Sequence, residues 1–273
     1  MSCYKYWGKI EDIANSLKEY GNIENYGSSD LDNVKLKEIL KLLNEVEVIA
    51  HDYTIDFDSA KHILDDSKMN EALKLIRNFY VYIGTRLETE NALKILKSKN
   101  PEKTLKSFTF HDKYKGLIKN ESQLVKFDEN KKIVFIGSGP LPLTLIMFNR
   151  LFKSKCVGIE INEEVATLSR EVLKKLNLDK DIEILVGNEK IIANIDYDII
   201  MVAALAEPKD RVFANIWEIV NEKDPVLYRT YTGMRAILYS PVTDKQTRGF
   251  HKEVMMLPTG TTNNTSVLIR KII

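Results

Sequence analysis

Apolar residues recur at helical spacing through the first half of the chain. In residues 4–20 they fall at Ile10, Ile13 and Leu17, and the same spacing of three and four continues beyond them. No stretch before residue 130 alternates as a strand does, so we predict an all-helical domain over residues 1–125. Its expected helices are 4–20, 31–51, 56–66, 69–97, a short one after Asn100-Pro101, and 114–125, with a turn-rich break at 21–29.

After residue 130 short apolar runs alternate with amphipathic stretches. This order predicts a mostly parallel sheet with helical crossovers, in a second domain over residues 126–273. Near the end two β-rich runs flank Pro258-Thr259-Gly260, which predicts an antiparallel hairpin. The expected strands are 132–137, 155–161, 182–187, 197–205 and 225–231, then the hairpin strands 251–257 and 265–272; the expected helices are 141–152, 163–177 and 208–220.

The first of these strands ends in a turn that suits a ligand. It runs into Gly137-Ser138-Gly139-Pro140, and a helix follows directly. Glycines let a ligand approach the backbone closely, and a helix N-terminus presents free N–H groups. Glu160, about 20 residues further on, stands where a nucleotide-binding unit places the acid that accepts from ribose hydroxyls. The alternatives are a turn without a ligand and an exposed acid at a strand end.

The shortened glycine pattern favours S-adenosylmethionine over a dinucleotide. Pro142 stands where the G-x-G-x-x-G pattern has its third glycine, and S-adenosylmethionine has no pyrophosphate to be held. A doubly wound sheet closed by a hairpin resembles the class I S-adenosylmethionine-dependent transferase fold. The predicted fold class is therefore α/β, with a Rossmann-like domain of this type preceded by the all-helical domain.

Two later loops lie at the same predicted edge of the sheet, where such folds bind ligands. After the third strand, Asn188 can bond an adenine amino group, but it can equally be only a turn-forming residue. After the fourth strand, the apolar loop that contains Ala203 and Leu205 would wall the ligand. We therefore count all three residues as candidates for cofactor binding.

Two arginines mark the chain after the fifth strand. Arg229 and Arg235 flank Tyr231 in a segment rich in threonine and tyrosine. An arginine fork suits a carboxylate, so we expect this segment to bind an acidic substrate. The simpler alternative for each arginine is a surface side chain with a packed stem.

Glu88 and Tyr114 are two candidates from the helical part of the chain. Glu88 follows an apolar helix face that ends at Leu87. Taken alone, Glu88 is more simply a solvated helix carboxylate and Tyr114 a half-buried packing residue. Their catalytic interpretation depends on the family resemblance described below.

Composition narrows the function classes. The 40 basic and 39 acidic residues leave a net charge of +1, which gives no reason to expect a nucleic-acid or membrane partner. Cys3 and Cys156 lie far apart, which suits a reducing cytoplasm. His51 and His62 lack the spacing of metal ligands, so no bound metal is expected. No run of about 18 apolar residues is present to cross a bilayer.

The chain resembles the archaeal nicotianamine synthases almost from end to end. Runs of this length are far more specific than a glycine turn alone. Where the family often has a second glycine, this chain has Ser138. The stretches that carry the resemblance are 49–52, 54–57, 59–66, 78–81, Arg86-Leu87-Glu88, 134–137, Gly139-Pro140-Leu141-Pro142-Leu143-Thr144, 201–209, 228–239 and 263–267.

The resemblance implies a helical domain that covers a Rossmann domain, with the active cavity between them. Family members transfer the aminocarboxypropyl group of S-adenosylmethionine to an amine and release 5'-methylthioadenosine. Archaeal members are expected to begin from glutamate and to make a nicotianamine-like metal chelator, a metallophore. The family's catalytic glutamate and tyrosine correspond to Glu88 and Tyr114. The stretch 108–113 departs from the family pattern, so the match around Tyr114 is the weaker one.

Two other functions remain open from the sequence. One is a small-molecule methyltransferase that uses the same cofactor, and the other is a non-catalytic nucleotide-binding regulator. The expected partner is a small amino-acid acceptor such as glutamate, in the cytoplasm, and a homodimer is left open. A methyltransferase would release S-adenosylhomocysteine instead of methylthioadenosine, so the co-product separates the two enzymes.

Overall fold

The computed structural model describes residues 2–23 and 32–272. The chain divides into two compact units, which we call the helical unit (Met1–Leu87 with Tyr231–Pro241) and the sheet unit (Glu88–Thr230 with Val242–Ile273). The boundary between the units falls inside one long helix, whereas the predicted domain boundary lies at residue 125. The boundary at residue 125 therefore remains a prediction, and it concerns which parts of the chain fold independently.

Every regular element among the described residues of the helical unit is a helix, and polar side chains mark where two of these helices begin. The Asp32 carboxylate accepts from the N–H groups of Val34 and Lys35, and the Asp56 carboxylate accepts from Ser59 N–H at 2.7 Å. Most of the predicted break at 21–29 lies outside the described residues. The elements are α1 (Ser2–Lys18), α2 (Asn33–Ala50), α3 (Phe57–Leu64), η2 (Ser67–Met69), the part of α4 (Asn70–Lys97) up to Leu87, and η4 (Gly233–Ile237).

The η4 segment joins the helical unit from far along the chain. It contacts α2 and α3, and the Arg77 guanidinium donates to the Ala236 carbonyl oxygen at 2.6 and 3.1 Å. The fully buried side chains of Ile39, Ile63 and Phe79 form part of the core of this unit. Residues 231–241 thus pack with helices that precede them by more than 140 positions, which local patterning did not indicate.

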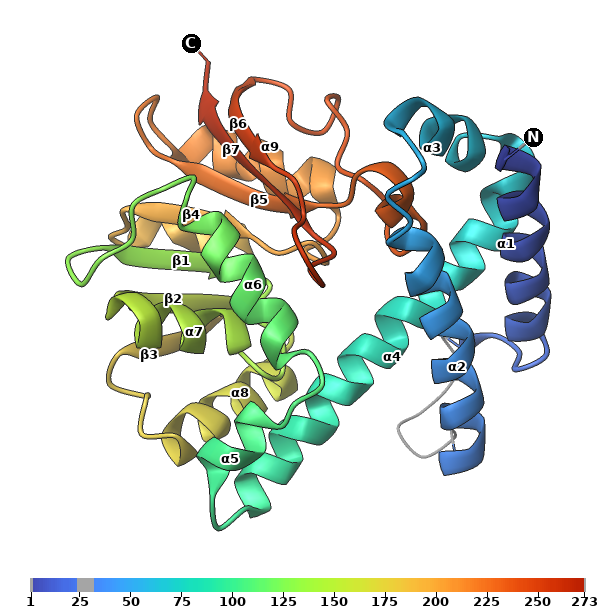
Figure 1. Ribbon diagram of the computed structural model, residues 1–273. Helices are drawn as coiled ribbons and strands as arrows, with labels where there is room; N and C mark the ends of the chain where they lie inside the picture. The colour runs from blue at the N-terminus through green and yellow to red at the C-terminus, as the bar shows by residue number, and fades with distance from the viewer. Residues whose placement is uncertain (1, 24–31, 273) are drawn as a thin grey trace. The chain divides into compact units, whose positions relative to one another are not determined.

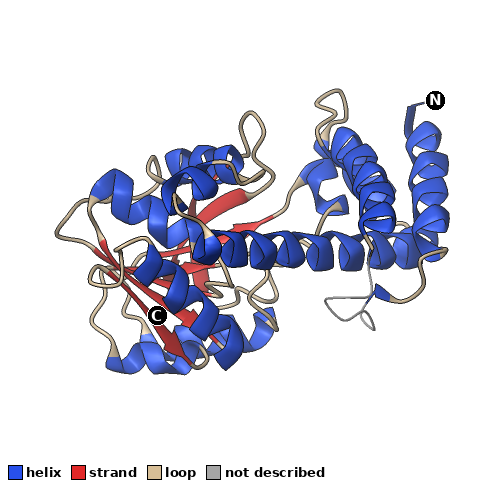
Figure 2. Cartoon of the chain, turned by 90° about the horizontal axis from the view of Figure 1, so that it is seen from below, coloured by secondary structure: helices blue, strands red, loops and turns tan. Residues whose placement is uncertain are grey.

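The sheet unit contains a single seven-stranded sheet, in the order β3-β2-β1-β4-β5-β7-β6. The first five strands in this order are parallel, and the hairpin of β6 and β7 adds antiparallel to β5, as predicted. Figure 2 shows all strands of the described chain gathered in this sheet. The strands are β1 (Lys132–Ile136), β2 (Lys155–Glu160), β3 (Ile182–Val186), β4 (Ile199–Val202), β5 (Val226–Thr230), β6 (Phe250–Met256) and β7 (Thr265–Lys271).

Helices of the sheet unit pack on the sheet and on each other. Helices α7 and α8 contact β2 and β3, and α6 contacts α7 (Figure 1). The fourth strand is shorter than predicted because the chain turns at Ala203, and α6 begins at His111, three residues earlier than predicted. The helices are the remainder of α4, α5 (Pro101–Lys106), α6 (His111–Glu121), α7 (Leu143–Phe152), α8 (Glu163–Lys175), η3 (Glu189–Asn194) and α9 (Lys209–Ile219).

The strand order reverses between β1 and β4, which are neighbours in the sheet. Open α/β sheets bind ligands at such a switch point, beside the carboxyl ends of the strands. Gly137, Glu160 and Ala203 stand at the ends of β1, β2 and β4. The fold therefore brings three of the predicted cofactor residues to the same edge of the sheet.

Candidate active site

The turn after β1 has a backbone shape that favours glycine. Gly137 and Gly139 have φ values of +84° and +70°. The Gly137 N–H donates to the Ile159 carbonyl oxygen at 2.8 Å, which ties the turn to β2. A Cβ on Gly137 would lie 3.2 Å from the Cβ of Ala203, closer than most such contacts. The positive φ favours glycine at both positions, and the loop that follows β4 leaves little room for a side chain at Gly137.

Glu160 holds this turn from the end of β2. Its Oε2 accepts from the Gly139 N–H at 3.0 Å, and its Oε1 accepts from the Asn162 N–H at 3.1 Å. A carboxylate offers about four lone-pair sites, so acceptor capacity remains on both oxygens. The predicted acid and the predicted glycine turn are thus in direct contact, about 20 residues apart in the sequence.

Ser138 and Pro140 are buried within the same turn. Among the described residues, the Ser138 hydroxyl has no hydrogen-bond partner, although its oxygen is inaccessible to solvent. A buried polar atom without a partner costs stability, so the Ser138 hydroxyl is available to bond an ordered water or a polar group of a ligand. The N-terminus of α7 follows at Leu143 without a side-chain cap. These features fit a site for the nucleoside part of a cofactor.

Glu88 and Tyr114 meet beside this turn. The Tyr114 hydroxyl donates to Glu88 Oε1 at 2.9 Å. The other carboxylate oxygen, Oε2, lies 3.5 Å from the position that a Cβ on Gly139 would take. The two residues that the resemblance implied as catalytic are therefore a hydrogen-bonded pair against the glycine turn.

The environment of Glu88 makes it a weak acid. Burial of the carboxyl raises its pKa to about 7, while the Tyr114 hydrogen bond and the positive charge of Arg229 lower the pKa in part. A general base works best when its pKa is near the working pH. The simpler interpretation of Glu88, a solvated helix carboxylate, does not agree with this environment.

Arg229 at the end of β5 binds a carboxylate, but that carboxylate belongs to the protein. Its Nε and Nη2 donate to the two oxygens of Glu121 at 2.7 and 2.9 Å, and its Nη1 donates to the Thr144 hydroxyl at 2.9 Å. The side chains of Arg229 and Glu121 are 5% and 0% exposed, which excludes the interpretation of Arg229 as a surface residue. Its binding of an acceptor carboxylate stays a prediction.

The loops after β3 and β4 contain the remaining cofactor candidates. The Asn188 side chain caps η3 by accepting from the Lys190 N–H at 3.0 Å, which agrees with its turn-forming alternative. Leu205 is exposed. Lys209, which is buried, donates from Nζ to the carbonyl oxygens of Ala204 and Ala206. This lysine holds the loop of Ala203 and Leu205 in place from within.

Tyr231 and Arg235 belong to the helical unit, and both are buried. The Arg235 guanidinium lies 5.0 Å from the centre of the Tyr53 ring, and its Nη2 donates to the Tyr53 hydroxyl at 3.0 Å. Tyr231 packs against Tyr239, with ring centres 5.9 Å apart. Arg235 and Arg229, which the sequence placed in one segment, therefore belong to different units of the structure.

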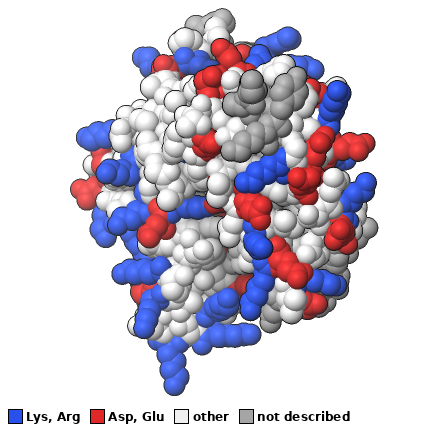
Figure 3. Space-filling view, turned by 45° about the vertical axis from the view of Figure 1, so that its right-hand side comes forward, with Lys and Arg blue, Asp and Glu red and all other residues white. Residues whose placement is uncertain are grey.

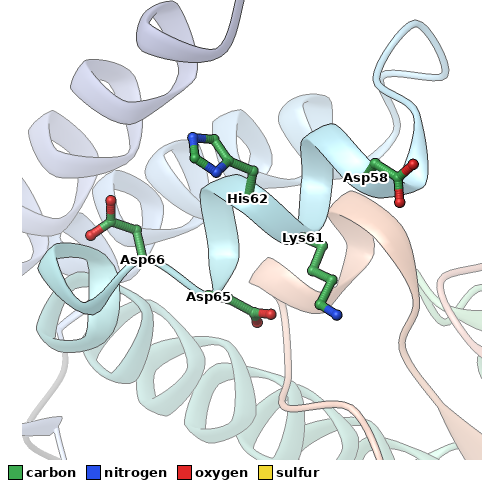
Figure 4. A pocket seen from close by; sticks show the side chains of 5 residues that line it. All are labelled: Asp58, Lys61, His62, Asp65 and Asp66. Carbon is green, nitrogen blue, oxygen red and sulfur yellow. The ribbon is translucent and has the colours of Figure 1, made fainter.

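A pocket in the helical unit contains none of the predicted residues. Its lining side chains do not converge on one point (Figure 4), and the ring of His62 stacks on that of Trp7 instead. Within residues 2–23 and 32–272, no group of three or more His, Cys, Asp or Glu side chains is arranged to hold a metal ion. The pocket is lined by Asp58, Lys61, His62, Asp65 and Asp66.

One face of the described surface carries both signs of charge. On the face drawn in Figure 3, basic and acidic side chains are interspersed, with mainly basic ones along its lower edge. No helix among the described residues is both long and apolar enough to pass through a bilayer.

Sequence reasoning missed three buried charged residues of the sheet unit. Glu121 pairs with Arg229, Lys209 holds the loop after β4, and Glu189 accepts from Arg211 at 3.0 Å. Each looks like an ordinary helix-end charge in the sequence, because the partner is distant along the chain or is a backbone oxygen. A buried, paired charge has no local signature, so only the fold identifies them.

Comparisons with known proteins place this chain among nicotianamine synthases and related transferases. The nicotianamine synthase of Solanum lycopersicum is 28% identical to this chain over 225 residues, which cover 77% of this chain and 71% of that protein. An L-histidine 2-aminobutanoyltransferase of Pseudomonas aeruginosa is 22% identical over 49% of this chain and 51% of its own length.

Solved structures extend the likeness to the whole chain. The crystal structure of MtNAS in complex with MTA and tNA is 46% identical over 100% of both chains, with a TM-score of 0.94. A mutant of MtNAS in complex with S-adenosylmethionine has a TM-score of 0.91 over the same coverage. The family model described as "Nicotianamine synthase protein" matches residues 10–273. This chain belongs to the nicotianamine synthase family.

Proposed function

We propose that this protein transfers the aminocarboxypropyl group of S-adenosylmethionine to the amine of an amino acid. The acceptor would be glutamate or a unit already derived from S-adenosylmethionine, and the product a nicotianamine-like metal chelator. The observation that carries the proposal is the Tyr114–Glu88 hydrogen bond beside the Gly139 turn, in a chain of this family. MtNAS has been crystallised with S-adenosylmethionine and with MTA, which supports the same donor for this chain.

The turn and the strand ends would hold the donor. Glu160 would accept from the ribose hydroxyls with the lone pairs left free by its two backbone N–H donors. The Gly137–Pro140 turn would lie along the nucleoside, and the Ser138 hydroxyl would gain a partner. Asn188 would bond the adenine amino group, and the loop that contains Ala203 and Leu205 would form a wall of the ligand site, as expected from the sequence.

Glu88 would act as general base. An amine is protonated at neutral pH and must lose a proton before it can attack carbon. The nitrogen forms a bond to the γ-carbon of the donor, the γ-carbon–sulfur bond breaks, and its electron pair stays on sulfur as methylthioadenosine leaves. The proton released from nitrogen passes to the Glu88 carboxylate, whose pKa of about 7 suits the task. Tyr114 would orient both the carboxylate and the amine.

Arg235 and Tyr231 would recognise the acceptor. Tyr53 fixes the Arg235 guanidinium by stacking and by one hydrogen bond to Nη2. A guanidinium held in one orientation has the planar fork that matches a carboxylate of the acceptor or of the growing chain. We expect the protein to act in the cytoplasm, and a homodimer remains an expectation to be tested.

Product analysis tests the proposal. The purified protein is incubated with S-adenosylmethionine and, in separate samples, with glutamate, histidine or no acceptor, and the products are identified by mass spectrometry. We expect methylthioadenosine and an acceptor that has gained an aminocarboxypropyl group. Formation of S-adenosylhomocysteine with a methylated acceptor would identify a methyltransferase. Donor binding without turnover across a wider panel of amino acids would identify a regulator.

A further inference from the structure

The Glu121–Arg229 pair is the most completely buried ion pair among those the structure describes. Besides the two bonds between them, Arg229 donates to the Thr144 hydroxyl, and Glu121 Oε1 accepts from the Ser266 hydroxyl at 3.1 Å. The guanidinium also lies 5.1 Å from the centre of the Phe135 ring. Nε, Nη1 and Nη2 of Arg229 are each bonded within the protein, so its orientation is fixed.

This pair and the proposed base contact the same short segment. Glu88 lies against Gly139 at the glycine turn, and Arg229 is bonded to Thr144 in the first turn of α7. Glu121 lies on α6, the helix that also contributes Tyr114. The titratable groups around Glu88 include Tyr114 from α6 and Arg229 from β5, with Glu121 behind Arg229. Glu160 at the end of β2 is a further carboxylate there, because it accepts from the N–H of the same Gly139.

We infer that Glu121 and Arg229 form a positioning pair for Glu88, in which Glu121 fixes Arg229 as a stationary positive charge near the base rather than as a ligand of the acceptor. The inference rests on the proposed function. Its physical reason is that a cation near a carboxylate favours the ionised, proton-accepting form. Because the Arg229 fork is already bidentate to Glu121, it cannot also grip an incoming carboxylate in that geometry.

The charges predict opposite effects of two variants. Glu121→Gln leaves Arg229 uncompensated, so the pKa of Glu88 falls and the acidic limb of the kcat profile moves to lower pH. Glu121→Gln with Arg229→Met removes both charges, so the limb moves to higher pH, by about 1 pH unit. The double variant buries no unpaired charge and is the one expected to keep its fold.

The experiment measures the rate of methylthioadenosine release as a function of pH. Separately, carbon-13 NMR follows the titration of the Glu88 carboxyl, whose signal is assigned as the one that is lost in Glu88→Gln. The matched control is Lys131→Met with Asp198→Asn, which neutralises a half-exposed pair of the same unit with a 2.9 Å contact. This control variant should leave the pH profile of the rate and the NMR titration of Glu88 unchanged. Opposite shifts in the two variants support the inference, and if Glu121→Gln does not fold, the upward shift in the double variant decides.

Three results would overturn the inference. The first is that the variants lose the same fraction of the rate at every pH while the Glu88 titration does not move, because this pattern indicates a purely structural effect. Another is an unchanged profile in folded variants. The third is a rise in the acceptor KM with an unmoved titration, which would return Arg229 to substrate binding. A wild-type protein that releases no methylthioadenosine instead refutes the proposed function, and the NMR titration still tests the pair.

Discussion

The Tyr114 hydroxyl on α6 donates to the Glu88 carboxylate on α4 at 2.9 Å, across 26 positions of sequence. The bond stabilises the ionised form of Glu88 and so opposes the effect of burial, which raises the pKa of that carboxyl to about 7. A base held near neutrality is half ionised at the pH where it works. Burial on one side, and this hydrogen bond together with the Arg229 charge on the other, therefore set the fraction of Glu88 that is ionised.

Replacing Tyr114 by phenylalanine should raise the pKa of Glu88 further. A hydrogen bond to a charged group contributes about 1.5–3 kcal/mol, so the acidic limb of the kcat profile should move up by about 1–2 pH units. The pH dependence of methylthioadenosine release measures the shift. Tyr197→Phe is the matched control, because Tyr197 donates to Asp224 at 3.0 Å elsewhere in the sheet unit. An unmoved limb in Tyr114→Phe would mean that the hydroxyl does not act on the base.

Glu88→Gln removes the proton acceptor and keeps the size of the side chain. We expect kcat to fall by about 10²–10⁴ at neutral pH, with S-adenosylmethionine affinity nearly unchanged. Raising the pH should restore part of the rate, since more of the acceptor amine is then already neutral. The exposed Glu71 on the same helix provides the control, Glu71→Gln, which should retain wild-type rates. Wild-type turnover in Glu88→Gln would show that the base is another group.

The same residue should lower the stability of the protein at high pH. The pKa of Glu88 is about 7 when folded against an ordinary 4.5, so between these pH values the folded state binds more protons than the unfolded state. The contribution of this group to the free energy of unfolding therefore falls as pH rises from 4.5 to 7. Glu88→Gln abolishes this loss, so its Tm relative to wild type should be higher at pH 8 than at pH 5. Calorimetric scans at the two pH values decide, and an equal difference at both would place Glu88 in a solvated environment.

Glu160→Ala should weaken the binding of S-adenosylmethionine. The ribose hydroxyls would lose a charged acceptor worth about 1.5–3 kcal/mol, and the Gly139 N–H would lose its partner. Calorimetric titration measures the affinity, and circular dichroism checks the fold. Glu183→Ala changes an exposed acid of the adjacent strand β3 and should leave the affinity unchanged. Equal affinity in a folded Glu160→Ala protein would remove Glu160 from the site.

Local patterns were enough to predict most of the elements. Helical spacing, the caps at Asp56 and Asn100, and the alternation after residue 130 each describe neighbours in sequence, and the structure contains those elements within a few residues. The glycine turn and Glu160 were predictable for the same reason, because strand, turn and acid form one local unit. The hairpin of β6 and β7 was predictable in the same way, because its two strands are β-rich runs that follow each other closely in the sequence.

Long-range contacts were not predictable from these patterns. The pairing of Glu121 with Arg229 spans 108 positions, and nothing near either residue indicates the other. The η4 segment contacts α2 and α3, although its sequence follows a strand of the sheet. The pairing of Glu88 with Tyr114 was implied by the family resemblance and not by spacing. Burial of charge is a property of the packed chain, so it becomes visible only in three dimensions.

Arg235 offers the sharpest test of acceptor recognition. Its guanidinium is held by the Tyr53 ring and hydroxyl, and lysine can reproduce the charge but not the planar fork. We expect Arg235→Lys to raise the acceptor KM about tenfold or more, with the KM for S-adenosylmethionine unchanged, because one charge-assisted hydrogen bond contributes about 1.5–3 kcal/mol. Arg248→Lys, at an exposed position, is the control and should behave as wild type. Steady-state kinetics with each substrate varied in turn provide the measurement. If Arg235→Lys and Arg235→Ala both retain near wild-type kinetics, the residue serves only to pack Tyr53, and the acceptor carboxylate is bound elsewhere.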